Sequence, residues 1–349
     1  MTNTNSQTLA RRENPLLRYL KANGGILIAL AILVTFISIR SEYFWTPLNM
    51  KSLLLSVTTT ALLGLGMMML LITGYIDLSP GSTFALCAVF LCKMMEHWGC
   101  NFYVSLIGTL LFGGLLGAVS GTIIAYTAMP AFIVTLAMDN VKRGVAYLIS
   151  GRSLKIYSLN PTLKAFGNGT LLGVPYAAWI ILACCIIIGI LLNRTVLGRH
   201  LYATGGNQKA AIVAGVNVRK TCIVAYIIMG MLAALAGCIS ASKSASGQPT
   251  IGTDIMSDAV AAAVLGGTAF SGGKGTVSGT ITGVILIGVM LNSMNLMEIS
   301  YYWQLLFKGI LIVAAVFIDE VKAKNEGRRS FLSMVFKREG KDNRLTASK

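Results

Sequence analysis

The stretch NRTVLGRHLYATGGNQKAAIVAGVNVRK, residues 193–220, is a polar, glycine-rich segment inside a very apolar chain. It carries basic residues and no acidic residue, the basic ones being Arg194, Arg199, Lys209, Arg219 and Lys220. Long apolar runs flank it on both sides. A basic loop between hydrophobic spans normally lies on the cytoplasmic side of the membrane. The stretch therefore predicts a polytopic membrane protein in which this loop faces the cytoplasm.

The second half of this loop has the signals of a short helix. Asn207 is a favourable N-cap, because its side-chain oxygen can accept an unpaired amide of the first turn. Gly215 can end the helix in the left-handed conformation. Between them lies a small-residue face formed by Ala210, Ala211 and Ala214. Such a helix would suit docking by another protein; the alternative is a solvated loop with a turn at Gly205–Gly206.

The composition indicates a helical membrane protein. Of the 349 residues, 55% are hydrophobic and only 12% are charged, and the mean hydropathy is +0.71. A soluble domain has about twice that charged fraction. The net charge of +16 does not indicate a nucleic-acid partner, because the basic residues are scattered over loops and tails without a basic groove. Apolar runs predict ten spans, near residues 24–40, 53–73, 80–98, 103–126, 130–150, 171–192, 221–243, 255–268, 275–294 and 300–318.

Ten spans place both termini on one side of the membrane. With the N-terminus inside, the inner segments hold most of the 29 Lys and Arg residues, which supports an N-in, C-in orientation. The predicted organisation is a cytoplasmic N-terminal segment at 1–23, a transmembrane domain at 24–318 that contains the loop 193–220, and a charged cytoplasmic tail at 319–349.

No catalytic or cofactor site is evident in the sequence. The seven cysteines form no C-x-x-C pair, and with only two histidines no metal site is predicted. The stretch GGTAFSGGKG, residues 266–275, fails the phosphate-loop pattern, because Gly275 follows Lys274 where Ser or Thr is required. We interpret it as a tight turn between two spans. The chain is therefore not expected to be an enzyme.

A second polar interruption, GYIDLSPGS, spans residues 74–82. An aspartate between spans is costly in lipid, so Asp77 should face protein, water or a helix end. Asp77 or Ser79 can cap the next helix, and Pro80 suits its first turn. A helix-break turn with Asp77, Ser79 and Gly81 is the structural interpretation, and a proton- or ion-coupling carboxylate is the functional alternative.

Two of the predicted spans carry glycines at every fourth position. The two sets are Gly113, Gly117 and Gly121, and Gly275, Gly279 and Gly283. Glycines at this spacing share one helix face and allow close helix contact in lipid. They predict two tight helix interfaces.

Three motifs together resemble those of the inner-membrane permease subunits of bacterial ABC sugar importers, the ribose, galactose, xylose and arabinose permeases. They are a G-x-D-L-S-x-G turn, a cytoplasmic loop with F/L-G-R/K-x-x-x-A-x-G-G-N-x-x-A-A-x-x-x-G-V, and a G-G-x-x-F-x-G-G-x-G-T segment. The chain matches them at 74–81, 197–216 and 266–276. It departs in the first, where both Tyr75 and Ile76 separate Gly74 from Asp77. Branched-chain amino acid permeases are more distantly similar.

The resemblance implies an all-α, type II importer fold like that of vitamin B12 permeases. It also implies a second permease subunit, two cytoplasmic ATPase subunits or one fused double ATPase, a periplasmic or lipid-anchored binding protein, and a sugar substrate. The loop would couple to the ATPase, through Arg199, Tyr202, Gly205, Gly206, Asn207, Ala210, Ala211, Ala214 and Gly215. A proton-driven secondary transporter, an importer of an amino acid or other small solute, and a non-transporting structural subunit are the alternatives. Residues that bind substrate are not identified by the sequence.

Overall fold

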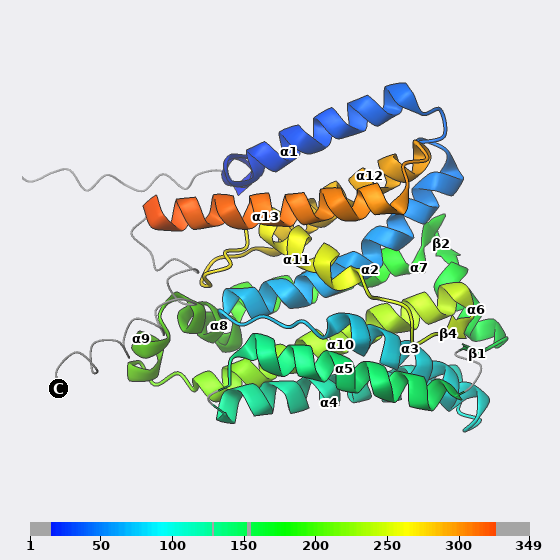
Figure 1. Cartoon of the computed structure of the whole chain (residues 1–349), viewed down its shortest axis with the longest axis horizontal. Helices are drawn as coiled ribbons and strands as arrows, with labels where there is room; N and C mark the ends of the chain where they lie inside the picture. The colour runs from blue at the N-terminus through cyan, green and yellow to red at the C-terminus, as the bar shows by residue number, and fades with distance from the viewer. Residues whose placement is uncertain (1–14, 128, 152–154, 326–349) are drawn as a thin grey trace, which may run out of the picture.

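The computed structural model describes residues 15–127, 129–151 and 155–325, and most of them are helical (Figure 1). The helices are α1 (Pro15–Arg40), α2 (Pro47–Ile72), α3 (Pro80–Glu96), α4 (Phe102–Tyr126), α5 (Ala131–Ser150), α6 (Pro161–Asn168), α7 (Tyr176–Arg194), α8 (Val196–Gly206), α9 (Gln208–Val213), α10 (Val218–Ser244), α11 (Ile255–Leu265), α12 (Val277–Leu296) and α13 (Tyr301–Asn325). Four two-residue strands complete the elements: β1 (Ile156–Tyr157), β2 (Thr170–Leu171), β3 (Val174–Pro175) and β4 (Ser246–Gly247).

A helix covers each predicted apolar run, but six helices of the described chain are long and apolar enough to cross a membrane. These are α2, α4, α7, α10, α12 and the Asn23–Arg40 part of α1. The predicted class, an all-α membrane protein, is confirmed. The helices extend beyond the predicted spans at both ends, because α1 begins at Pro15, although its apolar part begins at Asn23, and α13 continues past residue 318 to Asn325. Most of the N-terminal segment and the tail lie outside the described residues.

The core of the molecule lies around α2 and α10. Every residue of α2 from Ala61 to Ile72 is buried, and α10 packs against α2, α3 and α4. In contrast, α1 and α7 leave most of their apolar side chains at least partly exposed. In an aqueous protein such exposure would be costly, whereas lipid is a suitable solvent for it. The inner helices are thus held by protein contacts and the outer ones face lipid.

Five of the six glycines lie in tight helix interfaces, as predicted, whereas Gly275 precedes α12 and lies against the side chain of Ile72. A β-carbon on Gly117 of α4 would lie 2.1 Å from the carbonyl oxygen of Tyr226 in α10. On α12, a β-carbon on Gly279 would lie 2.1 Å from the carbonyl oxygen of Gly266. Real β-carbons do not approach backbone oxygens so closely, so these backbones meet only because the side chain is absent.

The two ends of the helix bundle differ. At one end lie α8 and α9, with the start of α1 and the end of α13 (Figure 1). At the other end lie α6 and the paired strands, where β1 pairs antiparallel with β4 and β2 pairs antiparallel with β3. These short strands were not predicted. The arrangement gives the chain one end made of helices and one made of turns and short strands.

Candidate functional site

The loop 193–220 is more ordered than the sequence indicated. Asn207 caps α9 as predicted, with its side-chain oxygen accepting from the amide of Ala210 at 3.1 Å. Gly215 follows the helix with φ of 81°, the left-handed conformation that was predicted. Gly205 and Gly206, where the solvated-loop alternative placed a turn, instead form the last turn of α8, a helix whose start is capped by Thr195.

The exposed face of α9 differs from the predicted one. Ala211 was placed in the middle of the docking face, but it is 3% exposed and packs inward against the rest of the chain. The exposed apolar side chains are Ile212, 58% exposed, and Val213, 89% exposed, beside the exposed Ala210 and Ala214. Two of the three alanines of the predicted face, Ala210 and Ala214, are thus exposed, whereas Ala211 faces inward.

Helix α8 is fixed to the end of α2 and to the glycine-rich turn at 266–276. A β-carbon on Gly205 would lie 1.7 Å from the carbonyl oxygen of Ile72, the last residue of α2. The Tyr202 hydroxyl donates to the carbonyl oxygen of Gly275 at 2.7 Å. The amide of Gly273, a residue with positive φ in the predicted tight turn, donates to the same Ile72 oxygen at 2.8 Å. Arg199 is exposed on α8. A displacement of α8 would therefore act directly on α2.

The turn at Asp77 contains a buried charge network rather than the predicted cap. One Asp77 carboxylate oxygen accepts from both the amide and the hydroxyl of Ser79, each at 2.7 Å. Ser79 occupies the N-cap position of α3, as one of the two predicted residues, but no side-chain cap bond is formed there. Pro80 does occupy the first turn. The Asp77 carboxylate accepts its hydrogen bonds within the turn, from Ser79, before the helix begins.

Lys142 of α5 completes this network and was not predicted as a site residue. Its ammonium donates to the Ser79 hydroxyl at 2.7 Å and to the Thr83 hydroxyl at 3.0 Å, and the side chain is buried. The Ser79 hydroxyl accepts from the cation and donates to Asp77, so it bridges two opposite charges. Such pairing is what a buried charge in a membrane protein requires. The contact joins α5 to α3 across the fold.

The third residue of the predicted turn, Gly81, lies against the segment before α11. A β-carbon there would lie 2.2 Å from the carbonyl oxygen of Gly252. The neighbouring Arg143 donates to the carbonyl oxygens of Pro249 and Ile251, at 2.8 and 2.7 Å. These contacts hold the 249–252 segment in place, and that segment borders a cavity.

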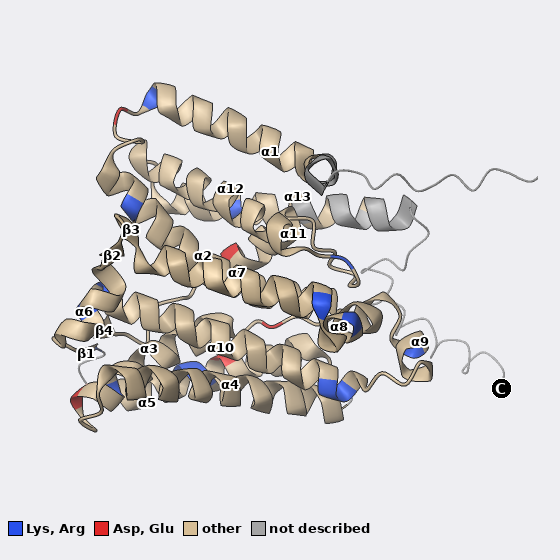
Figure 2. Ribbon diagram, turned by 180° about the vertical axis from the view of Figure 1, so that it is seen from behind, with Lys and Arg blue, Asp and Glu red and all other residues tan. Residues whose placement is uncertain are grey.

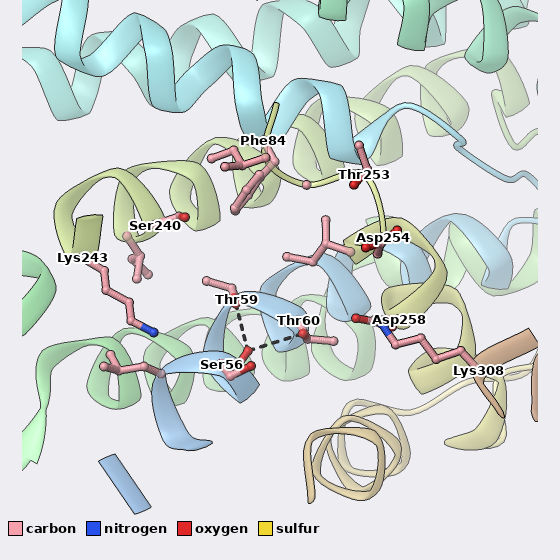
Figure 3. Close-up of a pocket in the computed structure, with 15 residues that line it drawn as sticks. Ser56, Thr59, Thr60, Phe84, Ser240, Lys243, Thr253, Asp254, Asp258 and Lys308 are labelled. Atoms are coloured by element: carbon pink, nitrogen blue, oxygen red, sulfur yellow. Dashed lines mark hydrogen bonds and ion pairs between the residues drawn. The ribbon is translucent and has the colours of Figure 1, made fainter. Parts of the chain in front are cut away.

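The cavity has a volume of about 370 Å³ and lies between α2, α3, α10, α11 and α13 (Figure 3). Side chains with oxygen or nitrogen form much of its lining: Ser56, Thr59, Thr60, Ser240, Lys243, Thr253, Asp254, Asp258 and Lys308. None of these residues was predicted from the sequence to bind substrate. One signal was present, because residues 56, 59 and 60 share a helix face by their spacing.

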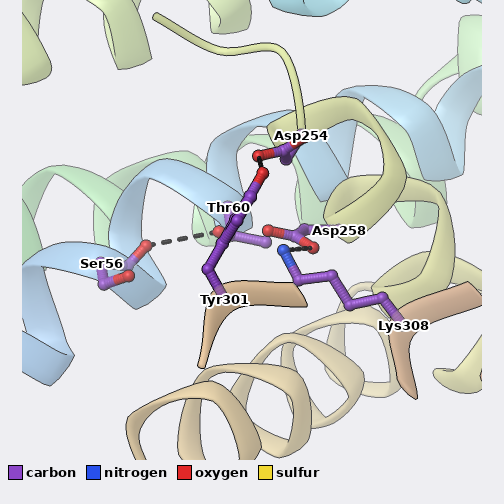
Figure 4. A network of polar contacts seen from close by, with 6 residues as sticks. All are labelled: Ser56, Thr60, Asp254, Asp258, Tyr301 and Lys308. Carbon is purple, nitrogen blue, oxygen red and sulfur yellow. Dashed lines mark hydrogen bonds and ion pairs between the residues drawn. The ribbon is translucent and has the colours of Figure 1, made fainter. Parts of the chain in front are cut away.

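Two contacts organise the acidic side of this cavity (Figure 4). The Lys308 ammonium lies 2.8 Å from a carboxylate oxygen of Asp258. The Tyr301 hydroxyl donates to the carboxylate of Asp254. Lys308 and Tyr301 belong to α13, whereas the carboxylates lie in and just before α11. The pairs therefore hold α13 against α11 while both carboxylates remain in the cavity lining.

Comparison with known proteins defines the class. The family model of the branched-chain amino acid transport system / permease component matches residues 49–316. The chain belongs to this family, and it is a multi-pass protein of the inner membrane. No solved structure matches it significantly.

Among curated proteins, the chain is similar to several sugar permeases. It is 38% identical to the ribose import permease protein RbsC of Escherichia coli (strain K12), over 85% of this chain and 93% of that protein. It is 34% identical to the D-allose transport system permease protein AlsC of Escherichia coli (strain K12), over 86% of this chain and 92% of that protein. It is 37% identical to the L-arabinose transport system permease protein AraH of the same organism, over 86% of this chain and 91% of that protein.

Proposed function

We propose that the chain is the transmembrane permease subunit of an ATP-driven importer for a monosaccharide. The observation that carries this proposal is the similarity to ribose, allose and arabinose permeases over more than four-fifths of the chain. In this function the chain forms the path for the sugar, and separate ATPase subunits hydrolyse ATP. A binding protein outside the membrane delivers the sugar, and a second permease subunit completes the membrane part.

The arrangement of the helices supports a ten-span, type II importer fold with both termini inside. The start of α1 and the end of α13 lie at the same end of the bundle as α8 and α9 (Figure 1). Arg194, Arg199, Lys209, Arg219 and Lys220 belong to the loop at this end. Figure 2 shows basic residues at the opposite end as well, so the orientation rests on the loop and on the basic tails rather than on an overall asymmetry.

The loop 193–220 is the proposed contact with the ATPase. Val213 and Ile212 expose apolar side chains on a short helix that projects from the end of the bundle. Apolar side chains on a short projecting helix such as α9 suit a pocket on a partner protein, because their burial there excludes water. Movement of α9 would reach α2 through α8, since Gly205 lies against the last carbonyl of α2. Nucleotide-driven movement of the ATPase would thus tilt the central helix of the permease.

Val213→Glu tests the contact. A carboxylate buried without a partner in the interface would cost several kcal/mol, which weakens binding by roughly a hundredfold or more. The matched control is Leu172→Glu, because Leu172 is 86% exposed in the turn between β2 and β3 at the opposite end. Co-purification of the ATPase with each variant, at equal membrane abundance, should fail only for Val213→Glu. Equal recovery with both variants would remove α9 from the interface.

A further inference from the structure

The cavity between α2, α10, α11 and α13 has the chemistry of a sugar site. Its volume of about 370 Å³ falls within the range of roughly 300–1,000 Å³ typical of small-molecule sites. Polar side chains are expensive inside a membrane protein and mark substrate pathways by default. Here they come from separate helices and surround one space (Figure 3). We propose that this cavity binds the sugar during its passage through the permease, an inference that rests on the proposed function.

The lining matches a polyhydroxylated ligand, because it offers both donors and acceptors. Hydroxyl groups in the lining belong to Ser56, Thr59, Thr60, Ser240 and Thr253. Thr59 and Thr60 donate to the backbone oxygen of Ser56, at 2.9 and 3.4 Å, and this leaves their oxygen lone pairs available as acceptors. A sugar hydroxyl can donate to one group and accept from another, so it fits such a mixture.

The charges of the lining favour a neutral ligand. Two lysines, Lys243 and Lys308, balance two aspartates, Asp254 and Asp258. Lys308 and Asp258 already pair with each other at 2.8 Å, and Asp254 accepts from Tyr301 (Figure 4). Each carboxylate has acceptor sites beyond the one its protein partner uses. An ion of either sign would meet like charge, whereas a sugar can bond to both kinds of group.

The position of the cavity along α2 is consistent with a place on the route of the sugar through the membrane. Ser56 and Thr60 precede Ile72, the α2 residue against which α8 is fixed, by twelve to sixteen positions. At 1.5 Å per residue they lie roughly 20 Å from α8 along the same helix. With α8 on the cytoplasmic side, the cavity is in the outer half of the membrane. A tilt of α2 would change the lining at Ser56, Thr59 and Thr60 directly.

Filling the cavity is the first test. Ser56→Trp places a large ring in the lining, and Ser52→Trp is the matched control, one turn earlier on α2, exposed, and not part of the lining. The assay measures ATP-dependent uptake of D-ribose, D-allose and L-arabinose by the reconstituted complex of permease, ATPase and binding protein. Uptake per assembled complex should fall about tenfold or more in Ser56→Trp, because the ring excludes the sugar. It should remain near the wild-type value in Ser52→Trp.

A milder pair covers the case in which the tryptophan variant does not assemble. Thr59→Val and Thr60→Val together remove two hydroxyls at nearly constant volume, and should reduce uptake by about tenfold if each lost bond costs about threefold. Thr58→Val is the control, because Thr58 lies on the same helix but is fully buried outside the cavity, donating to Leu54. The cavity assignment would be overturned if the double variant took up sugar as well as Thr58→Val does. It would also be overturned if an assembled Ser56→Trp complex showed undiminished uptake. Neither result would affect the proposed function. If the wild-type complex takes up no monosaccharide in an ATP-dependent way, in a panel that includes these three, the proposed function is overturned, and the cavity assignment with it.

Discussion

Gly205→Ala should uncouple the loop from the transmembrane domain, because no space exists for a single methyl group at this position. The added carbon would lie 1.7 Å from the carbonyl oxygen of Ile72 and 2.8 Å from the amide nitrogen of Gly273. Both neighbours are backbone atoms, which cannot rotate away as a side chain can. The contact is therefore relieved only if α8 moves away from the end of α2.

The magnitude follows from this geometry. Contacts under 3 Å are not tolerated, so α8 and α2 must separate by more than about 1 Å in a close-packed region. Overpacking of this kind lowers the free energy of unfolding by about 1–3 kcal/mol. The higher helix propensity of alanine relative to glycine offsets at most about 1 kcal/mol of this loss. The neighbouring Gly206→Ala is the control: nothing lies within 4 Å of its β-carbon position, so it gains propensity without a clash.

Two measurements test this prediction. Thermal unfolding of the purified permease should show Gly205→Ala to be less stable than wild type and Gly206→Ala to be equal or more stable. In the reconstituted complex, Gly205→Ala should retain bound ATPase, because α9 is unchanged, but should take up little sugar. If the two variants are alike in both stability and uptake, the contact between α8 and α2 contributes neither to stability nor to coupling, and the reasoning is refuted.

Gly117→Ala should lower the stability of the permease by about 1–3 kcal/mol, since its β-carbon would lie 2.1 Å from the Tyr226 carbonyl oxygen. Gly189→Ala on lipid-facing α7 should not, because nothing lies within 4 Å of its β-carbon position. Equal unfolding temperatures for the two variants would contradict a tight interface at Gly117. Asp77→Asn and Lys142→Met should each destabilise the protein, because each leaves the other charged group buried without its partner. Their double variant should lose about 1–3 kcal/mol less than the sum of the two, and additive losses would show that the Ser79 bridge does not couple them. Complete loss of transport in a stable Asp77→Asn complex would instead favour a coupling carboxylate.

Features determined by local sequence were predictable. The cap at Asn207, the left-handed Gly215 and the glycine interfaces each depend on a few neighbouring residues and a fixed helical spacing. The inward face of Ala211 was not predictable in this way, because α9 is so short that its sequence does not define which side meets the protein.

Features that depend on tertiary contacts were missed. Lys142 lies inside the predicted span 130–150 without a local motif, and its contact with Ser79 brings together two residues 63 positions apart. The ion pair of Asp258 with Lys308 joins two separate helices, and the cavity they line draws on further elements. Helices α2, α10, α11 and α13 contribute one to three polar residues each, and each such group alone is typical of an ordinary membrane helix. Only the fold shows that they face the same space.

The energy source of uptake tests the central claim most directly. Vesicles containing the permease with its ATPase and binding protein should accumulate a monosaccharide when ATP is supplied inside, whether or not an uncoupler has collapsed the proton gradient. A complex with a catalytically inactive ATPase should accumulate none. Uptake that persists with the inactive ATPase and is abolished by the uncoupler would contradict the account and identify a proton-driven carrier.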